Sequence, residues 1–212
     1  MLRVAGCVAD SIVDGPGLRF TVFFQGCPHH CPGCHNPETW AFEGGQECTP
    51  EELVALAKRS PLCKGITLSG GEPFEQPKAC ATLAAELKRN GYGVWSYSGY
   101  LYEDLAKRAA KARAERDRRI GALGGKALHE NPEEAMVSEA LADIADDLAV
   151  GDLLDSIDVL VDGPFVESRK SLELKWCGSS NQRLIDVPAT RRAGSVVEWQ
   201  PTSFSLEKPS NW

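Results

Sequence analysis

The sequence predicts an α/β domain built on a sheet of parallel strands. Apolar segments with strand character alternate with helical segments along the chain, an order typical of right-handed βαβ units. The predicted strands are almost continuously apolar, as expected for a sheet whose outer face is covered by helices. Each unusual short motif follows one of these strands directly, and parallel strands bring such motifs to one edge of the sheet.

Composition sets the broad class of the protein. The chain has 212 residues, of which 42% are apolar and 25% charged, and this is typical of one globular domain. Its net charge of −7 argues against a general nucleic-acid-binding role. No secretory signal is recognisable, and no segment reaches the roughly 20 apolar residues that cross a bilayer. We therefore expect a single cytoplasmic domain over residues 1–212 that binds neither nucleic acid nor membranes.

The first half of the chain gives clear element predictions. Residues 19–27 are rich in β-branched and aromatic side chains and predict a strand that leads into a cysteine loop. Thr49 and Glu52 form a capping box with Pro50 at the first helical position, which predicts a helix over 49–60. The further predicted strands are 65–73, 93–99 and 156–165, and the further predicted helices are 76–91, closed by Gly91, and 101–119.

The second half of the chain gives less definite element predictions. The glycines of 121–125 predict a break, after which Asn131 starts another helix that Gly151 ends. The basic residues of 107–119 alternate with alanines and acids, which favours a solvated helix face over a phosphate or nucleic-acid site. The segment 176–212 is turn-rich, and we expect it to be irregular. The apolar stripe of the second helix is Val137, Leu141, Ile144 and Leu148, with Pro132 and Glu134 in its first turn.

Three of the eight cysteines lie in one short loop, "FQGCPHHCPGCHNP". Cys27, Cys31 and Cys34 are spaced so that their thiolates can surround one metal centre. Structural zinc takes four ligands, usually in two separate pairs, and an ordinary 4Fe-4S cluster takes four cysteines. Three thiolates on a four-iron cubane leave one iron free for a substrate or cofactor. The alternatives are a zinc site completed by His29, His30 or His35, and a chance group of free thiols.

Polar and glycine motifs follow the other predicted strands. Gly70-Gly71-Glu72-Pro73, Ser96 to Gly99 and Asp162 to Pro164 would all reach the same edge of the sheet as the cysteine loop. Each motif alone has a simpler interpretation as a local turn. The five scattered cysteines are expected to pack as small hydrophobic residues. They are Cys7, Cys48, Cys63, Cys80 and Cys177.

Together, "CPHHCPGC" and "SGGEP" resemble the radical S-adenosylmethionine superfamily. Five stretches in order resemble, more narrowly, the activating proteins of anaerobic ribonucleoside-triphosphate reductase. These stretches cover most of the chain outside 102–155 and about the last thirty residues. They are "DGPGLRFTVFFQGCPHHCPGCHNPETW", "ITLSGGEP", "WSYSGY", "IDVLVDGPF" and "GSSNQRLID".

The resemblance implies a partial (β/α)6 barrel, the radical S-adenosylmethionine core. It also implies one 4Fe-4S cluster, because no further CxxCxxC run is present. By the same analogy, S-adenosylmethionine binds the open iron through its amine and carboxylate. The implied cluster ligands are Cys27, Cys31 and Cys34, and the implied cofactor contacts are Gly33, Cys34, His35, Gly70, Gly71, Glu72, Ser96 and Ser98.

The implied activity is that of a glycyl-radical-enzyme activating enzyme, an oxidoreductase. One electron cleaves S-adenosylmethionine to methionine and a 5′-deoxyadenosyl radical, which takes hydrogen from a glycine of the reductase large subunit. A flavodoxin is the implied electron donor, and no acid–base residue beyond the cluster ligands is required. Small-molecule radical enzymes that build deazapurines, and a zinc-binding module using Cys27, Cys31, Cys34 and His35, are the rival hypotheses.

Two features depart from the family pattern. Cys177 precedes "GSSNQ" where the family tends to carry a basic residue. The segment 107–150 is a helical insertion, either a docking surface for the partner or a solvated excursion without function.

Overall fold

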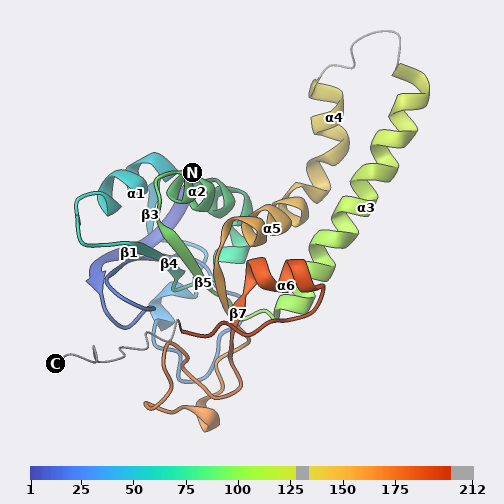
Figure 1. The fold of residues 1–212 in the computed structure, drawn as a ribbon. Helices are drawn as coiled ribbons and strands as arrows, with labels where there is room; N and C mark the ends of the chain where they lie inside the picture. The colour runs from blue at the N-terminus through green and yellow to red at the C-terminus, as the bar shows by residue number, and fades with distance from the viewer. Residues whose placement is uncertain (128–133, 202–212) are drawn as a thin grey trace, which may run out of the picture.

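The computed structural model describes residues 1–127 and 134–201, and these form a mixed sheet of seven strands in the order β3-β1-β2-β4-β5-β6-β7 (Figure 1). The four strands β2, β4, β5 and β6 run parallel, whereas β1, β3 and β7 add antiparallel edges. The predicted α/β class is confirmed. The strands are β1 Leu2–Ser11, β2 Arg19–Phe24, β3 Gln46–Cys48, β4 Gly65–Ser69, β5 Gly93–Tyr97, β6 Val159–Asp162 and β7 Arg183–Asp186.

Helices cover one face of this sheet and enclose the main core. Leu53, Leu83 and Leu153 from three helices pack with Phe24 and Ile66 of the central strands, and all five are fully buried. The helices are α1 Pro50–Ala57, α2 Pro77–Arg89, α3 Tyr102–Ala127, α4 Glu134–Leu141, α5 Ala145–Ser156 and α6 Val187–Ala193, with 3-10 turns at Pro37–Thr39, Pro73–Glu75, Ala142–Ile144 and Glu167–Arg169. Within the described parts, no helix combines the length and apolar character needed to span a bilayer.

Alternation along the strands separates the two faces of the sheet. In β5, Val94 joins the helix-covered core, whereas Trp95 and Tyr97 point to the opposite face. On that opposite face Trp95 contacts Trp176 and Trp199 edge-on, with ring centroids 5.6 and 5.0 Å apart. Residues at odd positions of the central strands therefore face away from the helices, toward the region where the functional motifs gather.

Several element predictions are confirmed. Helix α1 starts at Pro50 with the predicted capping box, in which Thr49 Oγ1 accepts from the Glu52 amide and Glu52 Oε2 accepts from the Thr49 amide. The four parallel strands match the four predicted ones, although each ends earlier than predicted, at Phe24, Ser69, Tyr97 and Asp162. Gly91 follows α2 with a positive φ of 82°, as a helix-ending glycine does.

The prediction of a break at 121–125 is wrong, because α3 runs without interruption to Ala127. A glycine inside a helix costs only about 1 kcal/mol, which the strong helix formers around it offset. Gly151 does not end a helix either, since α5 continues to Ser156. Asn131 and Pro132 lie outside the described residues. The predicted stripe is half-buried and is divided among α4, a 3-10 turn and α5.

The predictions lack three strands, β1, β3 and β7, and one helix, α6. Most residues of β1 after Val4 are exposed, so this strand lacks a periodic apolar pattern. The segment expected to be irregular forms β7 and α6, with Asp186 capping α6 through the Ala189 amide at 2.7 Å and Gly194 ending it at φ 69°. Figure 1 shows α3 and α4 side by side as a hairpin that projects away from the sheet.

Candidate functional site

A cavity of about 570 Å³ lies along the uncovered face of the sheet, at the carboxyl ends of the parallel strands. Its size is within the range of small-molecule and cofactor sites. Loops from far-apart parts of the chain meet there, as predicted from the strand order. Among the sequence-predicted site residues, its lining contains Cys27, Cys31, Cys34, His35, Gly70, Gly71 and Ser98.

The three loop cysteines lie on one wall of this cavity. β2 delivers the loop, and two backbone hydrogen bonds anchor it: the Gly26 amide donates to the Thr39 carbonyl at 2.8 Å and the Cys27 amide to the Trp40 carbonyl at 3.0 Å. Within the described residues, no three His, Cys, Asp or Glu side chains are arranged to hold a single metal ion. In a cubane each cysteine binds a different iron, so its thiolates need not converge on one point.

Backbone amides lie near the cysteine sulfurs. The Asn36 amide donates to Cys34 Sγ at 3.4 Å, and the amides of His29 and His30 lie where they favour the thiolate of Cys27. Burial raises the pKa of Cys27 to about 11, the nearby Glu72 carboxylate and Cys31 thiol add to this rise, and the two amides oppose it. Amide donors near sulfur suit thiolates that share charge with iron, so the donor set fits an iron–sulfur cluster.

Glu72 connects the three loops that form the cavity. Its side chain is only 1% exposed. One oxygen accepts from the Phe74 amide at 3.0 Å, and the other from His29 Nε2 at 2.9 Å and the Gly99 amide at 2.8 Å. Ser98 Oγ lies 3.1 Å from both oxygens. Both oxygens of Glu72 are therefore hydrogen-bonded within the protein, and Glu72 does not line the cavity. Its contacts hold the three loops together.

The glycine turn after β4 can adopt its shape only without side chains. Gly70 and Gly71 have φ of 45° and 65°, in the left-handed region. A Cβ on Gly71 would lie 2.5 Å from the Phe24 carbonyl oxygen. The Gly71 amide donates to Thr39 Oγ1 at 2.8 Å, which ties the turn to the cysteine loop. The turn therefore presents bare backbone to the cavity beside the cysteines.

The remaining predicted contacts divide between the cavity and its surroundings. Ser98 lines the cavity, whereas Ser96 is fully buried and, by alternation with Tyr97, points toward the helices. Gly33 has φ 72° and lies outside the lining, where its Cα faces the Glu167 side chain. His35 lines the cavity next to Phe165, with ring centroids 5.7 Å apart.

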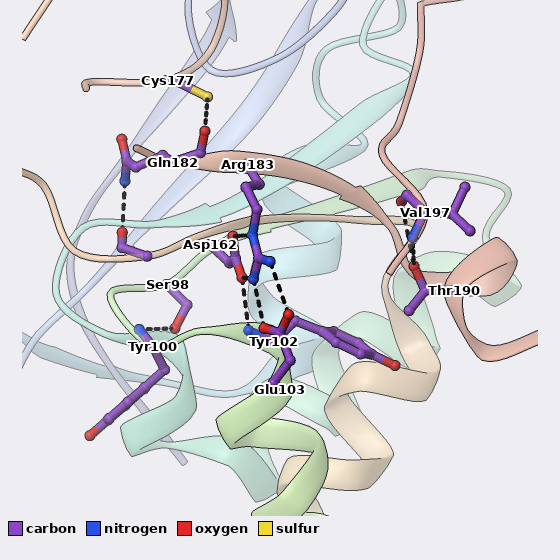
Figure 2. A network of polar contacts seen from close by, with 11 residues as sticks. Ser98, Tyr100, Tyr102, Glu103, Asp162, Cys177, Gln182, Arg183, Thr190 and Val197 are labelled. Atoms are coloured by element: carbon purple, nitrogen blue, oxygen red, sulfur yellow. Dashed lines mark hydrogen bonds and ion pairs between the residues drawn. The ribbon is translucent and has the colours of Figure 1, made fainter. Parts of the chain in front are cut away.

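The part of the cavity wall formed between β6 and β7 is held by polar contacts that Figure 2 shows. Gln182 Nε2 donates to the Gly163 carbonyl at 2.9 Å, and its Oε1 accepts from the Gly178 amide at 2.8 Å. Arg183 donates to the buried carboxylate of Asp162 and to Glu103, and both contacts raise the pKa of this guanidinium. Asp162 thus fixes β7 against the start of α3, behind the cavity wall.

Cys177 lies on this wall of the cavity. Burial raises the pKa of its thiol to about 11, and the Asp162 carboxylate adds to the rise. All eight cysteines are free thiols, and the packing expectation holds for the buried Cys63 and Cys80. Cys48 is half-buried like Cys177, whereas Cys7 is exposed, contrary to the expectation.

Sequence reasoning missed several lining residues. Asp14 lines the cavity, and its carboxylate accepts from Ser11 Oγ at 2.5 Å and Thr21 Oγ1 at 2.9 Å. An acidic residue before "GPG" was the available signal for it. Trp40 and Gln182 also line the cavity, and both stand in the motifs that carried the family resemblance.

Comparisons with known proteins agree with this geometry. Residues 13–135 and 129–185 match the family model described as a 4Fe-4S single cluster domain. The anaerobic ribonucleoside-triphosphate reductase-activating protein of Salmonella typhimurium is 31% identical over 180 residues, which are 81% of this chain and 90% of that protein. The protein of the same name from Escherichia coli K12 is 31% identical over 181 residues, again 81% and 90% of the two chains.

Other relatives match a shorter part of the chain. The pyruvate formate-lyase-activating enzyme of Clostridium pasteurianum is 42% identical over 116 residues, which are 50% of this chain and 49% of that enzyme. Since the family model covers most of the chain and the reductase-activating relatives match four fifths of it, the chain belongs to the family of anaerobic ribonucleoside-triphosphate reductase-activating proteins.

Proposed function

We propose that this protein activates an anaerobic ribonucleoside-triphosphate reductase as a radical S-adenosylmethionine enzyme. The single observation that carries the proposal is that one cavity collects the three loop cysteines and the glycine turn Gly70-Gly71. Membership of the family supports the same activity, with a 4Fe-4S cluster and S-adenosylmethionine as cofactors.

Each loop has a separate part in this proposal. Cys27, Cys31 and Cys34 bind the cluster, and the amides near their sulfurs stabilise negative charge there. Gly70 and Gly71 accept the amine of S-adenosylmethionine on their carbonyls, because no side chain keeps the ligand away. His35 and Ser98 contact the rest of the cofactor from the cavity wall. Glu72 positions all three loops and does not contact the cofactor itself.

When bound, the cluster supplies one electron for the reductive cleavage of S-adenosylmethionine, and the carbon radical so formed takes a hydrogen atom from a reductase glycine. The chain itself must keep water and stray side chains away from that reaction. Apolar side chains at the cavity suit this role, since Val8 and Val13 line it and Ile12 beside them is 73% exposed. We propose that a glycine-bearing segment of the reductase covers these side chains.

The finer architecture is proposed on the same basis. Parallel strands β2, β4, β5 and β6, with the cavity on their uncovered face, support a partial (β/α)6 barrel within a single domain over 1–212. The hairpin of α3 and α4 then corresponds to the helical insertion expected over 107–150. A flavodoxin-like protein is the proposed electron donor.

The proposal is tested by electron paramagnetic resonance of the reductase after anaerobic incubation with this protein, S-adenosylmethionine and a reductant. It predicts a glycyl radical doublet on the reductase, about four irons per chain, and release of 5′-deoxyadenosine. A matched reaction with the Cys31→Ala variant should give no doublet. A reconstituted wild-type protein that is colourless and free of iron would overturn the proposal.

A further inference from the structure

Trp40 carries a polar group that has no hydrogen-bond partner among residues 1–127 and 134–201. Its indole Nε1–H is shielded from solvent and makes no hydrogen bond within the described residues. Leaving a buried donor unpaired costs about 1–3 kcal/mol. Such a donor therefore indicates an acceptor that is in place only when the site is loaded.

The surroundings of Trp40 identify the class of acceptor. The side chain lines the cavity and contacts the His30 ring, with centroids 5.0 Å apart. Its backbone carbonyl accepts from the Cys27 amide at 3.0 Å, so Trp40 is fixed next to the first cysteine of the loop. The three cysteine sulfurs line the same cavity, and they are the acceptors that gain negative charge when a cluster is bound.

We propose that the Trp40 indole N–H donates a hydrogen bond to the thiolate sulfur of Cys27 once the 4Fe-4S cluster is assembled, and thereby raises the reduction potential of the cluster. This inference rests on the proposed function, since it concerns the cluster that function requires. Hydrogen bonds to sulfur stabilise the more negative, reduced form of an iron–sulfur cluster. The indole adds a side-chain donor to the two amides that already favour the same thiolate.

The experiment is an anaerobic redox titration of the reconstituted protein, followed by electron paramagnetic resonance. Trp40→Phe removes the N–H and keeps an aromatic ring against His30. The equilibrium constant for reduction should fall about tenfold, which is about 59 mV for one electron. The matched control is Trp176→Phe, which removes another indole of the cavity lining but not one beside Cys27, and its potential should not change.

A second measurement keeps the experiment decisive if Trp40→Phe does not fold. This measurement uses the Trp176→Phe variant labelled with [¹⁵N]tryptophan. In this variant, Trp40 is the tryptophan that remains in the described cavity lining. Pulsed resonance of its reduced cluster should show a ¹⁵N coupling. An unchanged potential in Trp40→Phe, an equal fall in Trp176→Phe, or no ¹⁵N coupling would overturn the inference. A wild-type protein without a cluster would instead overturn the proposed function.

Discussion

At the scale of single residues, Glu72 is the most informative side chain, and it lies outside the cavity lining. Glu72 was expected to contact the cofactor, yet both of its oxygens accept hydrogen bonds from the protein. Its buried carboxylate joins the cysteine loop, the glycine turn and the end of β5. We therefore propose that Glu72 supports the site through these neighbouring loops.

Glu72→Gln tests this role. The amide NH₂ would oppose donors that now point at a carboxylate oxygen, so the free energy of unfolding should fall by about 1–3 kcal/mol in urea denaturation. The affinity for S-adenosylmethionine should also fall, measured by equilibrium dialysis of the reconstituted protein. Glu75→Gln is the control, because Glu75 accepts a hydrogen bond from Tyr100 and lies outside the cavity lining. Equal effects of the two variants would contradict the role of Glu72.

Cys177 gives a prediction on pH. Burial, together with Asp162, raises the pKa of its thiol to about 11 from an ordinary value of 9.0. The folded state therefore holds this proton more tightly than the unfolded state. The stability that this difference in pKa contributes to the folded state is complete below pH 9 and is lost as the pH rises toward 11. Iodoacetamide modification of Cys177, followed by peptide mass spectrometry, should still accelerate between pH 9 and 10 in the folded protein. In denaturant, the rate at the same peptide should rise only about twofold over this interval, whereas it should rise almost tenfold in the folded protein; equal profiles would contradict the burial effect.

At the scale of elements, the glycine turn after β4 combines strained backbone with close contacts. An alanine in the left-handed region costs roughly 1–2 kcal/mol. Gly71→Ala should lower the free energy of unfolding by well over this amount, because its Cβ would also meet the carbonyl oxygens of Phe24 and Gly26. Gly91→Ala is a matched control, with φ 82° and no atom within 4 Å of the new Cβ. Chemical denaturation should separate the two variants. Similar losses of stability would show that the contacts at Gly71 do not constrain the turn.

Some of the helices and strands could be predicted from the sequence, and others could not. The central strands, α1 and the shared edge of the motifs followed from apolar runs, a capping box and parallel order. Strand β1 could not be predicted, because its C-terminal half is mostly exposed and lacks a periodic apolar pattern. Nor could the continuity of α3, where the cost of glycines is outweighed by neighbouring helix formers. Contacts between distant loops, such as those of Glu72, require the tertiary structure.

At the scale of the whole molecule, the exposed apolar residues beside the cavity belong to the proposed partner surface. Val13 is 71% exposed and lines the cavity. Val13→Asp should reduce glycyl radical formation on the reductase at least tenfold, because a charge would be buried under the partner. Cleavage of S-adenosylmethionine without the reductase should continue. Leu62→Asp, at an equally exposed apolar site outside the lining, is the control, and equal activation by both variants would contradict the proposed surface.

The central claim is that the cysteine wall and the glycine turn hold a cluster and S-adenosylmethionine in direct contact. Electron–nuclear double resonance of the reduced protein, with S-adenosylmethionine carrying ¹⁵N in its amine, tests this claim most directly. We predict a ¹⁵N coupling to the cluster that disappears when unlabelled cofactor is used. A reduced cluster that shows no coupling with saturating labelled cofactor would contradict the account.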